Sequence, residues 1–155
     1  MKHLIALIVS VLMIGNVAAQ EETLKGRLIT RMISGTFVDA PGVEGRSVGG
    51  GQYAGIAIFE DGRLADKQFV LNMDNGGAQG SYNGYATYTF QNGDALTLKF
   101  TGGWGPDGEG GDYEVLSGTG AYKGATGTGR FDAVKDPWKK ATLYDLTLKV
   151  TRGGS

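Results

Sequence analysis

Along much of the chain, large apolar residues alternate with polar ones, and this pattern predicts β-strands. In residues 141–151 every second residue is large and apolar: Tyr144, Leu146, Leu148 and Val150. Because successive side chains of a strand point to opposite faces, such a segment has one face for a core and one for solvent. Leu96, Leu98 and Phe100 follow the same alternation and predict a strand over residues 95–101.

Further strands are predicted where aromatic and β-branched residues cluster between turn signals. Residues 81–91 are rich in tyrosine, and Asn92-Gly93 predicts the tight hairpin turn that joins them to residues 95–101. The remaining predicted strands are 24–33, 52–60, 68–73, 112–116 and 127–134. Glycine-rich residues 34–51 predict a long connection or a bulged strand entry, and residues 102–111 predict a long exposed loop.

About eight short strands joined mostly by hairpin-type turns are typical of a β-sandwich or a closed antiparallel barrel. We expect the barrel, because eight strands close around a single core or one small ligand. The predicted fold is therefore all-β, an eight-stranded antiparallel closed barrel of the calycin-like meander type, formed by one domain over residues 20–155.

The first 19 residues have the organisation of a signal peptide. A basic start at Lys2 precedes an apolar run from Leu4 to Gly15, and the small residues Val17 and Ala19 fit the positions before a cleavage site. The apolar run is shorter than the ~20 residues that span a bilayer. We therefore expect cleavage before Gln20, export to the periplasm or the extracellular medium, and no stable membrane anchor afterwards.

The chemistry open to the exported chain is narrow, since it contains no cysteine and the only histidine is His3, inside the predicted signal peptide. This excludes Ser-His-Asp and Cys-His catalysis and zinc sites built on His or Cys. The full chain has 15 Lys and Arg residues and 16 Asp and Glu residues, so the sequence predicts no basic surface for binding nucleic acid. No metal site and no cofactor are expected.

Residues 117–132 hold five of the 28 glycines of the chain. A dinucleotide fingerprint that starts at Gly118 and Gly120 would need glycine where Lys123 stands. A Walker loop would need Gly-Lys-Ser/Thr, whereas the order here is Lys123-Gly124-Ala125. The segment therefore predicts a turn between two strands, with Tyr122 packed against its glycines.

The same segment resembles the glycine block of the allene oxide cyclase and dirigent barrel superfamily. The resemblance rests on Gly118-Thr119-Gly120, Tyr122, Gly124-Ala125 and Gly127-Thr128-Gly129, with the alternating strand at 143–150 in the corresponding later position. It implies an eight-stranded antiparallel barrel whose apolar interior holds a hydrophobic small molecule. The glutamate, asparagine and cysteine motif of the plant cyclases has no match in this sequence, so no catalytic residue is assigned.

Residues that combine an apolar body with a polar group are the candidates for lining such an interior. Asn72 lies between Leu71 and Met73 in an apolar strand, and Trp104 and Trp138 lie in connections where they are placed to cover the barrel mouth. Tyr113 belongs to the wider set of strand tyrosines considered for the lining. The predicted ligand-binding residues are Tyr53, Asn72, Tyr85, Tyr88, Trp104 and Tyr144.

Three hypotheses about function follow. The first is an exported barrel that binds a small, mostly apolar molecule in its interior. The second is a cyclase or isomerase that acts by confining a flexible substrate. The third is a non-catalytic structural or interaction module of the cell envelope. Neither the identity of a ligand nor the oligomeric state follows from the sequence.

Overall fold

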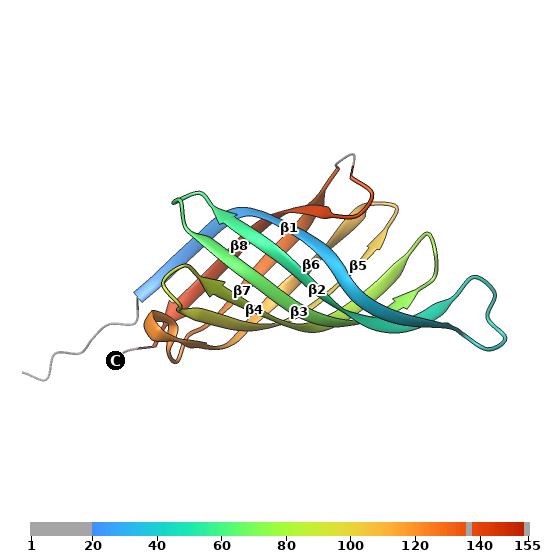
Figure 1. Ribbon diagram of the computed structural model, residues 1–155, viewed down its shortest axis with the longest axis horizontal. Helices are drawn as coiled ribbons and strands as arrows, with labels where there is room; N and C mark the ends of the chain where they lie inside the picture. The colour runs from blue at the N-terminus through green and yellow to red at the C-terminus, as the bar shows by residue number, and fades with distance from the viewer. Residues whose placement is uncertain (1–19, 136–137, 154–155) are drawn as a thin grey trace, which may run out of the picture.

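The computed structural model describes residues 20–135 and 138–153, so the predicted signal peptide at residues 1–19 lies outside the described part. Eight antiparallel strands close into a barrel in which each strand pairs with its neighbours in sequence and β1 pairs with β8 (Figure 1). The strands are β1 (Gln20–Asp39), β2 (Ser47–Phe59), β3 (Leu64–Asn75), β4 (Gly80–Phe90), β5 (Ala95–Gly105), β6 (Gly108–Thr119), β7 (Thr126–Val134) and β8 (Thr142–Arg152). The predicted fold class is confirmed.

The hairpin at Asn92-Gly93 lies where it was predicted, between the end of β4 at Phe90 and the start of β5 at Ala95. Gly93 has a φ of 87°, a backbone conformation that glycine adopts without steric cost. A short 3-10 helix, η1 (Gly120–Tyr122), forms the turn within the glycine-rich segment, and Tyr122 is buried there. Among the described residues no helix is long and apolar enough to cross a membrane.

Two predicted connections are largely strand. β1 continues through a register shift between Met32 and Ser34 to Asp39, so the bulged strand was the correct alternative for residues 34–51. The prediction of a long loop at 102–111 was wrong, because β5 and β6 extend to Gly105 and Gly108. Glycines occur here because a Cβ at Gly102 would lie 2.6 Å from the ring of Tyr82. Glycine at these positions makes room for aromatic rings inside the barrel.

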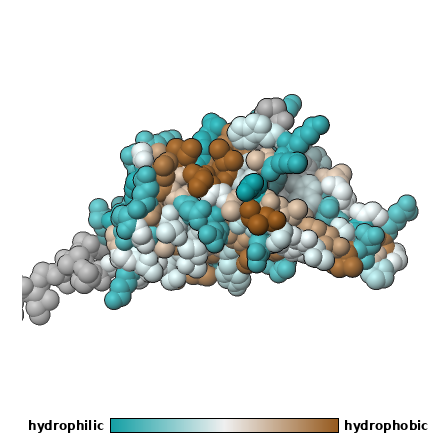
Figure 2. All heavy atoms as spheres, in the orientation of Figure 1, coloured by the Kyte–Doolittle hydropathy of each residue, from teal (hydrophilic) through white to brown (hydrophobic). Residues whose placement is uncertain are grey.

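The inward side chains of all eight strands form one hydrophobic core. As the alternation predicted, Leu146, Leu148 and Val150 of β8 are fully buried, as are Leu96 and Leu98 of β5. On the outer face of β2, Ile56 and Ile58 are 46% and 47% exposed. Figure 2 shows such hydrophobic groups among hydrophilic ones on the face that Figure 1 presents.

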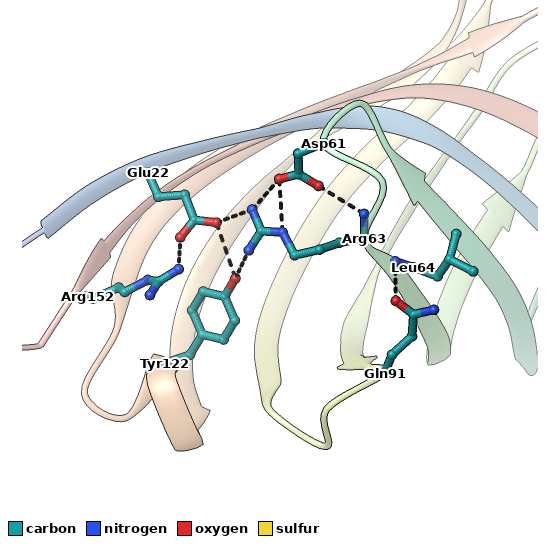
Figure 3. Close-up of polar contacts among 7 residues, drawn as sticks. All are labelled: Glu22, Asp61, Arg63, Leu64, Gln91, Tyr122 and Arg152. Atoms are coloured by element: carbon teal, nitrogen blue, oxygen red, sulfur yellow. Dashed lines mark hydrogen bonds and ion pairs between the residues drawn. The ribbon is translucent and has the colours of Figure 1, made fainter.

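The up-and-down topology gives the barrel two distinct ends. The turns after β2, β4 and β6 lie at the same end as the start of β1 and the end of β8. A polar cluster closes this end, drawn in Figure 3: Glu22 pairs with Arg63 at 2.5 Å and with Arg152, and the Tyr122 hydroxyl donates to Glu22 at 3.3 Å. Because these residues come from β1, β8 and two turns, the cluster joins the first and last strands to the connections between them.

Candidate functional site

A cavity of about 700 Å³ lies toward the opposite end of the barrel, where the connection between β7 and β8 contributes residues 138–142 to its lining. All eight strands contribute residues to its walls, among them Tyr82 of β4 and Tyr113 of β6. The other lining residues from the strands include Leu28, Thr30, Met32, Tyr53, Lys67, Phe69, Leu71, Met73, Phe100, Trp104, Glu109, Phe131 and Tyr144.

Aromatic rings form a large part of the cavity wall and pack against one another. Tyr53 stacks on Phe69 with ring centroids 4.9 Å apart, and Phe69 meets Phe100 edge to face at 5.9 Å. On the other side, Phe131 lies 4.9 Å from Tyr113 and 5.6 Å from Tyr144. Such geometries are favourable for aromatic pairs, so the wall is a preformed apolar surface.

Lys67 is the unusual residue of the cavity, because its side chain points inward from β3 and is only 3% exposed. Its Nζ donates a hydrogen bond of 2.6 Å to the Tyr113 hydroxyl, and the Tyr88 hydroxyl donates to Tyr113 at 3.1 Å. The same Nζ lies 4.2 Å from the ring centroid of Phe69 and 5.6 Å from that of Phe100. Lys67 therefore sits in a box of aromatic rings and hydroxyls.

The pKa of Lys67 is set mainly by its burial. The ring faces favour its ammonium form, but removal from water disfavours that form more strongly and lowers the pKa of Lys67 to about 7. Within the described residues, no carboxylate forms an ion pair with Lys67. Burial also raises the pKa of Tyr113 well above its ordinary value, so both neighbouring tyrosines stay protonated as hydroxyls.

Glu109 supplies a second polar group to the lining. Its Oε1 accepts a hydrogen bond of 2.6 Å from the Tyr144 hydroxyl and one of 3.4 Å from the Tyr82 hydroxyl. Burial, and then the negative charge of Glu109, raise the pKa values of both tyrosines. The carboxylate is thus held in place by two hydroxyl donors at the wall of an aromatic cavity.

The structure brings three of the six predicted ligand-binding residues into the cavity lining: Tyr53, Trp104 and Tyr144. Trp138 also lines it, and the indole N–H of Trp104 donates to the backbone carbonyl of Gly77 at 3.0 Å. Tyr88 is fully buried and contacts the site through the hydroxyl of Tyr113. Tyr88 belongs to the hydrogen-bonded group of Lys67, Tyr113 and Tyr88, and it does not line the cavity.

Asn72 and Tyr85 do not face the interior, which corrects the expectation for these two residues. Asn72 is exposed because its neighbour Leu71 takes the inward position on β3. Tyr85 is 54% exposed because the small residues Gly84 and Ala86 point inward on β4. A Cβ at Gly84 would lie 2.7 Å from the Phe100 ring, so this inward position of β4 has no room for a larger side chain.

Sequence reasoning missed Lys67 and Glu109. The alternation along β3 could have identified Lys67. Residues two apart in a strand share a face, and because Phe69 points inward, Lys67 must point inward as well. Glu109 was placed in a loop, whereas it is the second residue of β6. No group of three or more Asp, Glu, His and Cys residues that would hold a metal ion occurs in the described ranges.

The barrel is similar to solved dirigent and cyclase structures. The pterocarpan synthase dirigent proteins GePTS1 and PsPTS1 match with TM-scores of 0.60 and 0.60 at 14% and 13% identity, over 86% and 88% of this chain and 90% and 97% of theirs. A nonspecific heme-binding cyclase that catalyses a cycloaddition during neoabyssomicin biosynthesis matches with a TM-score of 0.55 at 17% identity, over 88% of this chain and 68% of that one.

No protein-family model matches the sequence, and no curated protein sequence matches it. At identities this low, likeness to solved structures shows a shared fold. The predicted resemblance to the dirigent and allene oxide cyclase barrels is confirmed at that level.

Proposed function

We propose that this protein is exported and binds a small, mostly apolar molecule in the cavity of its barrel. The observation that carries the proposal is the cavity itself, which residues from all eight strands line. Its volume of about 700 Å³ falls within the ~300–1,000 Å³ typical of small-molecule sites.

The lining indicates the kind of molecule that fits. Stacked and edge-to-face rings offer flat apolar surfaces, which suit an aromatic or polyunsaturated ligand. Two polar pairs in the lining, Lys67 with Tyr113 and Glu109 with Tyr144, are fixed by hydrogen bonds and suit one or two oxygen functions on that ligand. The dirigent and cyclase barrels with the same fold support a ligand-binding role for the interior.

Catalysis by confinement is the second candidate function, and the polar groups in the cavity are the observation that favours it. A purely apolar interior would hold a substrate without acting on its reacting atoms. Here the buried Lys67 amine and the half-buried Glu109 carboxylate both lie in the cavity wall. Groups held in this way are suited to orient a flexible substrate and to exchange protons with it.

Binding is tested with the fluorescent apolar probe N-phenyl-1-naphthylamine and with native mass spectrometry. We expect the probe to bind at one saturable site with increased emission, and an apolar molecule co-purified with the protein to compete for it. Solvent extraction of the protein before the titration should raise the number of free sites. Absence of saturable binding before and after extraction would contradict the proposal.

Export is tested separately by N-terminal sequencing of the protein recovered from periplasmic and extracellular fractions. The expected first residue is Gln20. Recovery only from the cytosolic fraction, with Met1 or Lys2 at the start, would overturn this part of the proposal.

A further inference from the structure

The lysines in the described part of the chain lie in different surroundings. Lys25, Lys99 and Lys149 lie on the outer face of the barrel and are exposed to water, and Lys139 and Lys140 line the cavity but are also exposed, whereas Lys67 points into the barrel and is buried. An exposed lysine is almost entirely protonated at neutral pH, and a protonated amine has no lone pair to share. Because burial lowers the pKa of Lys67 to about 7, about half of its population carries the neutral amine at that pH.

We propose that Lys67 forms a covalent imine with an aldehyde or ketone group of the apolar ligand. The proposal rests on the proposed binding function and names the chemical class of ligand that the cavity takes. Its geometric basis is that the Lys67 amine lines the cavity, forms no ion pair with a carboxylate among the described residues, and donates its hydrogen bond to the Tyr113 hydroxyl amid aromatic rings.

The surroundings of the amine suit each stage of this reaction. The rings of Phe69, Phe100 and Phe131 face the Nζ atom within 6.0 Å and offer an apolar surface to the carbon skeleton of the ligand. The Tyr113 hydroxyl, 2.6 Å from Nζ, is placed to donate a hydrogen bond to the carbonyl oxygen and to exchange a proton with it. The Tyr88 hydroxyl donates a hydrogen bond of 3.1 Å to the Tyr113 hydroxyl oxygen and keeps that hydroxyl in position.

The step balances without an oxidant or reductant. The lone pair of the neutral amine forms a bond to the carbonyl carbon, and the π electrons of the C=O bond move to the oxygen. That oxygen gains a proton as the nitrogen loses one, which gives a carbinolamine. The C–O bond then breaks, a second proton from the nitrogen leaves with the oxygen as water, and a C=N bond remains. One amine and one carbonyl thus become one imine and one water.

The test uses cinnamaldehyde as the probe, cinnamyl alcohol as its matched analogue without a carbonyl, and sodium cyanoborohydride to reduce any imine. Intact-mass spectrometry should show one addition equal to the mass of the aldehyde less one oxygen atom, and peptide mapping should place it on Lys67. At neutral pH, capture at Lys67 should be at least about tenfold faster than at Lys99, because burial lowers the pKa of Lys67 and the cavity holds the aldehyde beside its amine.

Four variants make the result specific. Lys67→Arg keeps a cation but lacks a nucleophilic amine, and Lys67→Met replaces the amine with an apolar chain of similar length; both should abolish the fast addition. Lys99→Met, on the outer face, should leave it unchanged. Tyr113→Phe keeps the amine and removes the adjacent hydroxyl, so capture should slow by about tenfold or more.

The two proposals fail in different ways. If cinnamyl alcohol and cinnamaldehyde displace N-phenyl-1-naphthylamine but the label spreads evenly over exposed lysines, binding stands and the imine is overturned. The imine is equally overturned if Lys67→Met retains the fast addition. If neither compound displaces the probe and the probe itself does not bind, the binding function fails.

Discussion

The Nζ of Lys67 lies 2.6 Å from the hydroxyl oxygen of Tyr113, and both side chains are buried inside the barrel. Lys67 belongs to β3 and Tyr113 to β6, two strands that are not neighbours in the sheet. The contact therefore crosses the interior. It places a buried basic group among aromatic rings, and it gives the cavity a chemistry that the fold alone does not require.

Replacement of Lys67 by methionine should change how stability depends on pH. In the unfolded chain the amine keeps its proton up to a pKa of about 10.4, whereas in the folded chain it loses it near 7. Folding is therefore opposed by the buried charge at low pH, and this cost disappears as pH rises toward the unfolded value. The stability of the native chain relative to Lys67→Met should rise by about 2 kcal/mol between about pH 6.5 and about pH 9.

Urea denaturation of both proteins across this pH range measures the difference. Lys67→Arg serves as the control, since its guanidinium stays charged throughout and should show a constant cost. Parallel pH profiles for the native chain and Lys67→Met would contradict the assignment of a buried, weakly basic amine.

Removal of the Glu22 charge should destabilise the closed end of the barrel. Glu22 faces both Arg63 and Arg152, and the exposed fraction of its side chain is only 13% (Figure 3). Glu22→Gln leaves two guanidinium groups close together without an anion between them, which should cost about 2 kcal/mol of unfolding free energy. The neighbouring variant Glu21→Gln, at an exposed position, should change stability by less than about 0.5 kcal/mol. Thermal and urea unfolding measure both variants. If Glu22→Gln and Glu21→Gln change the free energy of unfolding equally, the cluster does not stabilise this end of the barrel.

Alanine at Gly118 should be far more harmful than alanine at Gly105. A Cβ at Gly118 would lie 2.4 Å from the backbone oxygen of Tyr122 and 2.8 Å from that of Ala95, so the turn would have to shift. A Cβ at Gly105 meets nothing within 4 Å. We expect Gly118→Ala to cost about 2 kcal/mol or more, and Gly105→Ala to be neutral or stabilising by up to about 1 kcal/mol. The midpoint of urea unfolding measures both, and a similar loss in the two variants would contradict the close packing at Gly118.

Strand positions could be predicted because alternation reports burial directly when one face meets a core. β8 shows this, with Leu146, Leu148 and Val150 inside as predicted. Glycine was misleading at 102–111, since local reasoning associates it with turns while here it accommodates the rings of Tyr82 and Phe131. That requirement arises from strands packed across the interior and is not visible in the segment itself.

The candidate site could be predicted only in part, because alternation places residues on two faces without always saying which face is inside. Tyr53 and Tyr144 lie in the cavity wall, but Tyr85 points outward because Gly84 leaves space for the Phe100 ring. The alternation along β3 places Lys67 on the inward face. Sequence reasoning argues against that position, because a charged side chain is rarely buried without a partner. Only the arrangement of aromatic rings and hydroxyls around it shows how it is accommodated.

The central claim is that the cavity holds the ligand, and two neighbouring residues of β3 test it most directly. Leu71 lines the cavity, whereas Val70 is 49% exposed on the outer face. The measurement is titration of N-phenyl-1-naphthylamine into Leu71→Trp and Val70→Trp, each shown by circular dichroism to be folded. The account predicts that tryptophan at position 71 weakens binding by tenfold or more, while tryptophan at position 70 leaves it within about twofold of the native value. Native affinity in Leu71→Trp, or equal losses in the two variants, would contradict it.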